Sequence, residues 1–196
     1  MAAASAQQQP QSDAQAEQRT LVEFACKAAE TFVAAYYAAA DAPGRGSLIP
    51  TLYLPDSTIV WNGTPVSGRA GMAQLLAVMP GSKHELQAFD AHPLGGHARN
   101  GGKQAPSMLL TVNGIVTHHT PGSSSVVSGA SAPSSNAPRS AKEAHAEQVP
   151  YEALPRAFSQ SFVLISDLQR DGGIAAVEAD MHARYFVQAD QFRFVG

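Results

Sequence analysis

The stretch that most constrains the fold is a strand, a tight turn and a return strand that runs directly into a helix. Residues 57–61 are rich in β-branched and aromatic side chains, which is typical of a short strand. Asn62-Gly63 follows, and this dipeptide is the strongest short-range signal for a β-hairpin because both residues tolerate positive φ. Residues 65–67 begin the return strand, where the missing N–H of a proline matters little at an edge. Residues 69–79 can then continue as a helix, so we expect the rest of the chain to pack around this corner.

Three helices are predicted in the N-terminal half of the chain. Thr20 and Glu23 form a capping box directly before apolar residues at helical spacing, which predicts a long helix that ends near Asp41. Ser47 can cap a short second helix, and the helix over residues 69–79 is the third.

The domain organisation follows from where large apolar side chains are missing. Residues 1–18 lack them, so we predict a disordered N-terminal tail and a single folded domain over residues 19–196. Residues 95–105 are glycine-rich and are expected to form a flexible loop. Residues 120–153 are dominated by Ser, Ala, Pro and Gly, and a stretch of this length and composition is typical of a low-complexity insertion.

The remaining segments have the composition of strands. Three helices followed by strands predict an α+β fold in which the helices lie on one face of a curved antiparallel sheet. The four long strands are expected at residues 83–94, 107–118, 156–167 and 181–195.

The strands themselves indicate that both faces of the sheet need cover. A sheet with one solvated face should alternate apolar and polar residues. Here residues 108–110, 162–165 and 185–187 are apolar at consecutive positions. Since the helices can cover one face, a second protein chain is the simplest cover for the other.

Charge and composition exclude several classes of function. The net charge is −3 and the 13 Lys and Arg residues are scattered, so no basic stripe indicates a nucleic-acid surface. The longest apolar run, residues 32–40, is far shorter than the roughly 20 residues of a membrane helix, which predicts no membrane partner. His118 and His119 are adjacent and would point to opposite faces of a strand. With no phosphate-binding loop or nucleophile elbow either, we predict no metal and no cofactor.

Several short motifs, taken in order, carry a resemblance to a known family. The sequence resembles the nuclear transport factor 2 superfamily and, more narrowly, the small subunit of the TAP-type messenger RNA export receptor, called mRNA transport regulator in fungi. The resemblance covers about residues 20–118 and 154–196. The motifs that carry it are Trp61-Asn62-Gly63, Val66-Ser67-Gly68, Leu75-Leu76, Met79-Pro80-Gly81-Ser82-Lys83-His84, Phe89-Asp90-Ala91-His92-Pro93 and the closing Tyr185-x-Val187-x-x-Asp190-x-Phe192-Arg193-Phe194.

The resemblance implies a cone-like domain whose sheet packs against the related domain of a large export-receptor subunit. Such heterodimers carry messenger ribonucleoprotein through the nuclear pore by touching the Phe-Gly repeats of nucleoporins, mostly through the large subunit. The implied location is therefore the nucleus, the nuclear pore and the cytoplasm, and the implied role is not enzymatic.

By the same resemblance, Arg193 reaches a carboxylate across the interface. An arginine between Phe192 and Phe194 on the last strand is a plausible guanidinium fork in a largely desolvated surface. A surface arginine at a strand end is the alternative. The residues expected to contact the partner are Arg193, Phe192, Phe194, Asp190, Tyr185, Val187, Phe162 and Leu164.

The insertion at residues 120–153 is longer than the family's hairpin requires and resembles the extended loop of fungal members. That loop is linked to ribosomal RNA contact and to export of large ribosomal particles. Arg139 and Lys142 could contact phosphate, although Glu143 and Glu147 offset their charge. A plain linker remains the alternative.

A small-molecule enzyme of the dehydratase or isomerase type, or a ligand-binding homodimer, is the alternative function, because the same fold class includes such proteins. A Tyr, Asp and His set could perform acid–base chemistry if an aspartate were held in a dry pocket. Asp90 and His92 should share a face of a strand, but the spacing does not show that the set converges. The candidate cavity residues are Tyr37, Tyr53, His84, Asp90, His92 and Asp190.

Overall fold

The computed structural model describes residues 9–95, 105–119, 154–166 and 184–195. The helical elements are α1 (Gln9–Asp41), the short α2 (Arg45–Leu48), the 3-10 turn η1 (Ile49–Leu52) and α3 (Gly68–Val78). The glycine-rich loop, apart from its ends, and the insertion at residues 120–153 lie outside the described residues, as do Arg139 and Lys142.

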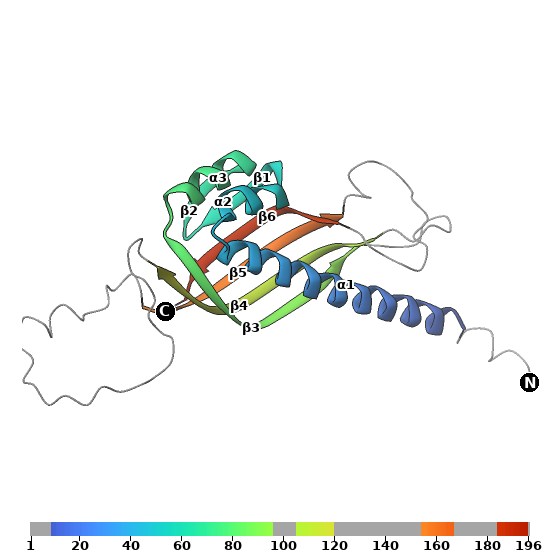
Figure 1. Ribbon diagram of the computed structural model, residues 1–196. Coiled ribbons are helices and arrows are strands. Elements are labelled where there is room, and N and C mark those ends of the chain that lie inside the picture. The colour runs from blue at the N-terminus through green and yellow to red at the C-terminus, as the bar shows by residue number, and fades with distance from the viewer. Residues whose placement is uncertain (1–8, 96–104, 120–153, 167–183, 196) are drawn as a thin grey trace, which may run out of the picture.

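Six strands form one mixed sheet in the order β2-β1-β6-β5-β4-β3 (Figure 1). All neighbouring pairs are antiparallel except β1 and β6, which run parallel. In the chain they are separated by β2, α3 and the three strands β3, β4 and β5. The predicted α+β architecture is confirmed. The strands are β1 (Tyr53–Trp61), β2 (Thr64–Ser67), β3 (Gly81–Leu94), β4 (Ser107–His119), β5 (Arg156–Ser166) and β6 (Tyr185–Phe194).

The β1–β2 corner forms as its sequence predicts. Asn62 and Gly63 adopt φ values of +46° and +86° between strands paired from Trp61↔Thr64 onward. Positive φ at both central residues is the type I′ arrangement that matches the twist of a hairpin. The return strand then leads directly into α3.

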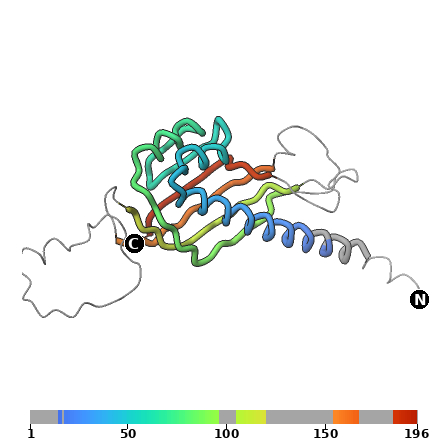
Figure 2. The backbone as a smooth tube through the Cα atoms, in the orientation of Figure 1, coloured from blue at the N-terminus to red at the C-terminus, as the bar shows by residue number. Residues whose placement is uncertain are grey.

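The first helix begins earlier than predicted. Residues 9–18, predicted to belong to a disordered tail, are helical, while residues 1–8 lie outside the described part. Thr20 is therefore inside the helix, where its hydroxyl donates to the Ala16 carbonyl at 3.0 Å and does not cap the start. Ala and Gln, which dominate this segment, have high helix propensity, so the helix can continue past the point where packing ends. Figure 2 shows α1 running along one face of the sheet and projecting beyond it.

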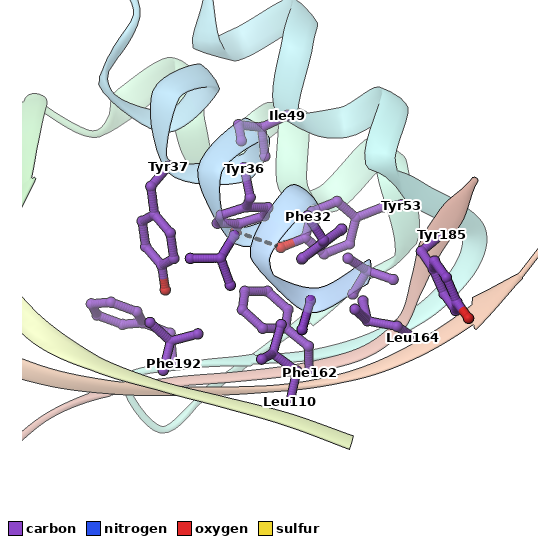
Figure 3. Packing of buried hydrophobic residues seen from close by; sticks show 14 of the residues in the cluster. Phe32, Tyr36, Tyr37, Ile49, Tyr53, Leu110, Phe162, Leu164, Tyr185 and Phe192 are labelled. Carbon is purple, nitrogen blue, oxygen red and sulfur yellow. Dashed lines mark hydrogen bonds between the residues drawn. The ribbon is translucent and has the colours of Figure 1, made fainter. Parts of the chain in front are cut away.

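The core lies between that face and the helices (Figure 3). Phe162 of β5 is fully buried and meets Phe32 and Tyr36 of α1 edge to face, with ring centroids 5.5 and 4.9 Å apart. Gly114 of β4 admits the close approach of β3 and β5, since a Cβ there would lie 2.5 Å from the Glu85 carbonyl oxygen.

No helix in the described part of the chain is long and apolar enough to cross a bilayer.

Candidate partner-binding face and buried polar cluster

The two faces of the sheet differ in what covers them. Along β5, every second residue from Phe158 to Ser166 is buried against the helices, and the residues between them are half-buried on the opposite side. We call the helix-covered side the inner face and the other side the outer face. Residues directly opposite each other in an antiparallel pair share a face. The pairing of β5 with β4 and β6 therefore assigns the residues of those strands to the inner or the outer face as well.

Apolar side chains gather at one end of the outer face. Leu109 lies opposite Val163, Val163 lies opposite Ala189, and Ile165 lies opposite Phe186. Leu109 is 37% exposed and the other four residues are half-buried. We call this set the outer patch: Leu109, Val163, Ile165, Phe186 and Ala189.

On β4, β5 and β6, the remainder of the outer face is mostly uncharged and polar. Ser159, Ser161 and Gln191 occupy the same side of β5 and β6 as the outer patch. Arg193 lies opposite Ser159 and is exposed. Among the described residues within β4, β5 and β6, it is the only charged side chain on the outer face.

Six residues predicted to contact a partner lie in the core instead. This corrects the expectation, because a residue buried beneath the helices cannot reach a protein that docks on the outer face. Phe192 and Phe194 also do not flank Arg193, since adjacent strand residues point to opposite sides. Phe194 is half-buried at the end of the inner face, where the Arg156 guanidinium lies 3.6 Å from its ring centroid. The six buried residues are Phe162, Leu164, Tyr185, Val187, Asp190 and Phe192.

Asp190 belongs to a buried polar cluster between α1 and the sheet. The Tyr53 hydroxyl donates to its Oδ2 at 2.6 Å, and the Gln160 amide donates to both carboxylate oxygens at 2.9 and 3.0 Å. Tyr37 donates to Gln160 Oε1 at 2.9 Å, and the Tyr36 and Tyr53 hydroxyls are 2.9 Å apart. The cluster thus joins β1, β5 and β6 to α1 by hydrogen bonds inside the core.

Burial controls the protonation of this cluster. It raises the pKa of Asp190 to about 7, and the hydrogen bonds from Tyr53 and Gln160 limit the rise. Among the described residues no cation forms an ion pair with Asp190. Burial also raises the pKa of Tyr36 and Tyr53 well above the usual range for tyrosine, so both hydroxyls stay protonated and can donate.

Titration of Asp190 should make the stability of the chain depend on pH. The folded-state pKa of Asp190 is raised above the unfolded value of about 3.9. The contribution of Asp190 to the free energy of unfolding is therefore largest at low pH, and it is lost as the pH rises through about 7. Asp190→Asn removes this titration. Between pH 5 and pH 8, the free energy of unfolding of the variant should therefore gain about 2.7 kcal/mol relative to the native chain. Urea unfolding at both pH values measures the gap, and a gap that does not change with pH would contradict the assignment.

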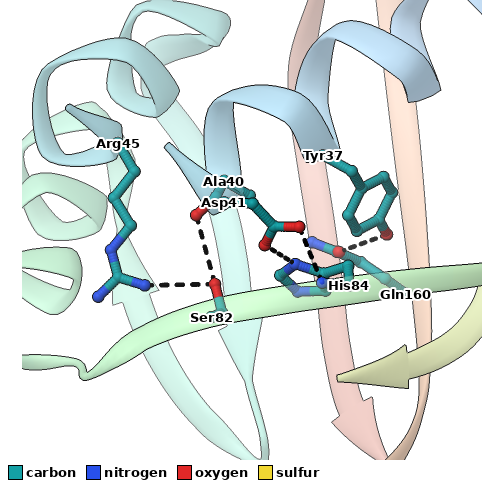
Figure 4. A network of polar contacts seen from close by, with 7 residues as sticks. All are labelled: Tyr37, Ala40, Asp41, Arg45, Ser82, His84 and Gln160. Carbon is teal, nitrogen blue, oxygen red and sulfur yellow. Dashed lines mark hydrogen bonds and ion pairs between the residues drawn. The ribbon is translucent and has the colours of Figure 1, made fainter. Parts of the chain in front are cut away.

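A second polar group ties the end of α1 to β3 (Figure 4). Asp41 accepts the backbone N–H of His84 at 2.8 Å and lies 2.6 Å from His84 Nδ1. Burial by itself would raise the pKa of Asp41, but these hydrogen bonds and the charge of His84 hold it below its usual value.

The six residues that the sequence predicts as candidates to line a cavity therefore lie in three different places. Tyr37, Tyr53 and Asp190 meet in the buried cluster, and His84 joins Asp41. Asp90 and His92 share a face as predicted, but they lie on the exposed outer side of β3, 3.0 Å from each other. Among the described residues, no three His, Cys, Asp or Glu side chains gather in a way that could hold a metal ion.

A family comparison agrees with this architecture. The Nuclear transport factor 2 (NTF2) domain model matches residues 28–123, and the helices-on-curved-sheet arrangement extends over the described remainder. The chain has an NTF2-like fold.

Two curated proteins illustrate how far sequence similarity to the NTF2-like domain extends. NTF2-related export protein 1 of Bos taurus is 37% identical over 76 residues, which are 39% of this chain and 53% of the relative. NTF2-related export protein 2 of Mus musculus is 32% identical over 98 residues, which are 50% of this chain and 66% of the relative. The chain thus matches between about half and two thirds of the length of these relatives.

Solved structures show the same fold at low sequence identity. The structure of Mtr2 has a TM-score of 0.54 and 17% identity, with 88% of this chain and 99% of that chain covered. The structure of the Chaetomium thermophilum Mex67 NTF2-like domain complexed with Mtr2 gives a TM-score of 0.53 and 16% identity, with 88% and 99% covered. At these identities the likeness shows the fold of the NTF2-like domain alone.

Two groups of functional interest were not expected from the sequence. Gln160 is 1% exposed at the centre of the polar cluster, although a glutamine in a strand is ordinarily expected at the surface. The outer patch consists of the alternate members of the apolar runs, namely Val163, Ile165 and Phe186, next to Leu109 and Ala189. The run at residues 162–165 indicated that both faces of this strand are apolar. It did not indicate which two of the four residues face the helices and which two face outward.

Proposed function

We propose that this chain is the non-catalytic small subunit of a heterodimeric nuclear export receptor, and that its outer face packs against the NTF2-like domain of a large subunit. The observation that carries the proposal is the outer patch, which extends without interruption over three central strands. A contiguous apolar surface with a polar surround is typical of a protein–protein interface.

The names of similar proteins support the export role. The two curated relatives are called NTF2-related export proteins, and in a structure of the same fold the Mex67 NTF2-like domain is complexed with Mtr2. By analogy, the partner of this chain is a large subunit that carries a related domain. In this proposal the heterodimer transports messenger ribonucleoprotein between nucleus and cytoplasm, with Phe-Gly nucleoporins bound jointly with the large subunit. RNA contact through Arg139 and Lys142, and export of pre-ribosomal particles, are further parts of the proposal.

The proposed interface combines a large buried surface with one charged side chain, Arg193. An obligate interface of this kind buries roughly 2,000 Å² or more of accessible surface. The outer patch supplies the apolar contact, and Arg193 supplies a guanidinium that can receive a carboxylate of the partner in bidentate geometry. Ser159 and Ser161, with small hydroxyl side chains, allow a second sheet to approach closely between these two sites.

Co-expression with the NTF2-like domain of the large subunit tests the proposal. We expect a stable one-to-one heterodimer by size exclusion and mass measurement, whereas the chain expressed alone should self-associate through its outer face. A monodisperse monomer that does not bind the domain would overturn the proposal.

Reversal of the charge at Arg193 should weaken the heterodimer. Arg193→Glu would place a carboxylate against the partner's carboxylate, which is expected to lower the affinity by a few kcal/mol. Arg19→Glu is the matched control, because Arg19 is exposed on α1, on the side of the domain away from the outer face. Titration calorimetry should show unchanged affinity for the control. Equal affinities for both variants would remove Arg193 from the proposed interface.

A further inference from the structure

The outer face continues past β4 onto the edge strand β3 (Figure 1). Pairing with β4 places Leu94, His92 and Asp90 on the same side of the sheet as the outer patch. His92 lies directly opposite Leu109, and Leu94, which is 43% exposed, extends the apolar surface beyond it. The outer patch therefore adjoins a titratable pair, because His92 Nε2 lies 3.0 Å from Asp90 Oδ2.

An interface of the expected size has to reach beyond the three strands that carry the outer patch. Neighbouring strands lie about 4.8 Å apart and rise about 3.3 Å per residue, so three strands of 10 to 13 residues present a flat face of roughly 500 Å². An obligate interface buries about 1,000 Å² or more on each partner. A protein docked on β4, β5 and β6 therefore also covers the strands beside them, and β3 is one of these two neighbours.

The Asp90–His92 pair is solvated in the isolated chain and would lose water in the heterodimer. The His92 and Asp90 side chains are 64% and 74% exposed. Removal of water strengthens the attraction between opposite charges and makes an uncompensated carboxylate costly. Among the described residues, no Lys or Arg forms an ion pair with Asp90. Within the chain, its charge is therefore compensated only when His92 carries a proton.

The other groups that face this pair leave His92 and Asp90 to control each other. The β4 residues opposite them, Leu109 and Thr111, are uncharged. Among the described residues on the outer side of β3, Lys83 and Glu85 also carry charge, but they lie toward the start of the strand. The helix α1 runs along the inner face, on the other side of the sheet (Figure 2). The remaining influence on His92 is the surface that covers it.

We propose that the Asp90–His92 pair makes association with the large subunit depend on pH, because a proton is taken up at His92 when the two subunits associate. This inference rests on the proposed function, since it requires a partner on the outer face. In the heterodimer the imidazolium donates its Nε2–H to Asp90, and the covered pair carries no net charge. The partner surface over the pair is accordingly uncharged, since a lysine or arginine there would repel the imidazolium.

The direction of the pH dependence follows from linkage. A group that gains a proton on binding makes the affinity rise as the pH falls through its titration range, which for histidine is ordinarily centred near pH 6.5. The heterodimer should therefore be tighter at pH 6 than at pH 8. A partner cation at Asp90 would produce the opposite direction, because protonated His92 would then compete with it.

Titration calorimetry of the full-length chain with the NTF2-like domain of the large subunit, in buffers of different ionisation enthalpy, tests this proposal. His92→Gln keeps an amide donor but does not titrate. Relative to this variant, the native chain should gain about 5-fold in affinity between pH 8 and pH 6 and should take up about half a proton at pH 7. Asp90→Asn removes the charge that retains the proton, so it should lose both effects as well.

His119→Gln is the matched control, because His119 is exposed at the opposite end of β4 from Leu109. This control should keep the pH dependence of the native chain. If the native chain and His92→Gln form heterodimers with the same pH dependence, or if the native chain binds relatively more weakly at pH 6, this inference is overturned and the proposed function stands. Failure to form a heterodimer at any pH would overturn both.

Discussion

Replacement of Val163 by aspartate should abolish pairing with the large subunit while leaving the domain folded. Val163 lies at the centre of the outer patch, opposite both Leu109 and Ala189. In the isolated chain an aspartate there would remain in contact with water. In the proposed heterodimer the same carboxylate would be buried without a partner, at a cost of at least about 3 kcal/mol, which is a loss in affinity on the order of 100-fold.

Val78→Asp provides the matched control, because Val78 is 81% exposed on α3 and does not lie on the outer face. Calorimetric titration with the NTF2-like domain of the large subunit measures both variants, and circular dichroism verifies that each is folded. The control should bind like the native chain. Retained affinity in folded Val163→Asp would exclude the outer patch as the interface and would require another surface for the partner.

The sequence predicts the elements that depend on local signals. Asn62-Gly63 forms the expected turn because its two residues tolerate positive φ, whatever the rest of the chain does. The start of α1 shows the limit of such signals. The capping box at Thr20 has the correct residue types, but the preceding segment favours a helix as well, so the local pattern does not distinguish a first turn from an interior one.

The candidate site is less accessible to sequence reasoning, because it depends on which alternate strand residues face the helices. The run Phe162-Val163-Leu164-Ile165 is apolar throughout, so either pair could form the core. Contacts between distant segments decide the matter, as in the hydrogen bond between Tyr37 and Gln160. Once Gln160 is fixed beneath α1, the strand period places Phe162 and Leu164 inside and Val163 and Ile165 outside.

The neighbouring residue Phe162 should behave in the opposite way to Val163. Phe162→Ala removes a fully buried ring that meets Phe32 and Tyr36 edge to face. Loss of the ring and the cavity left behind should lower the free energy of unfolding by about 4 kcal/mol, as is typical of a Phe→Ala change in a core. Urea unfolding of the full-length chain measures the effect.

Val163→Ala is the control for Phe162→Ala, because it shortens a half-buried side chain on the opposite face. It should change the free energy of unfolding by about 1 kcal/mol or less, since its surroundings are already partly solvated. The pair of variants therefore tests the sidedness of β5 directly. If Phe162→Ala destabilised the chain no more than Val163→Ala, the assignment of inner and outer faces would be wrong, and the outer patch would lose its place in the proposed interface.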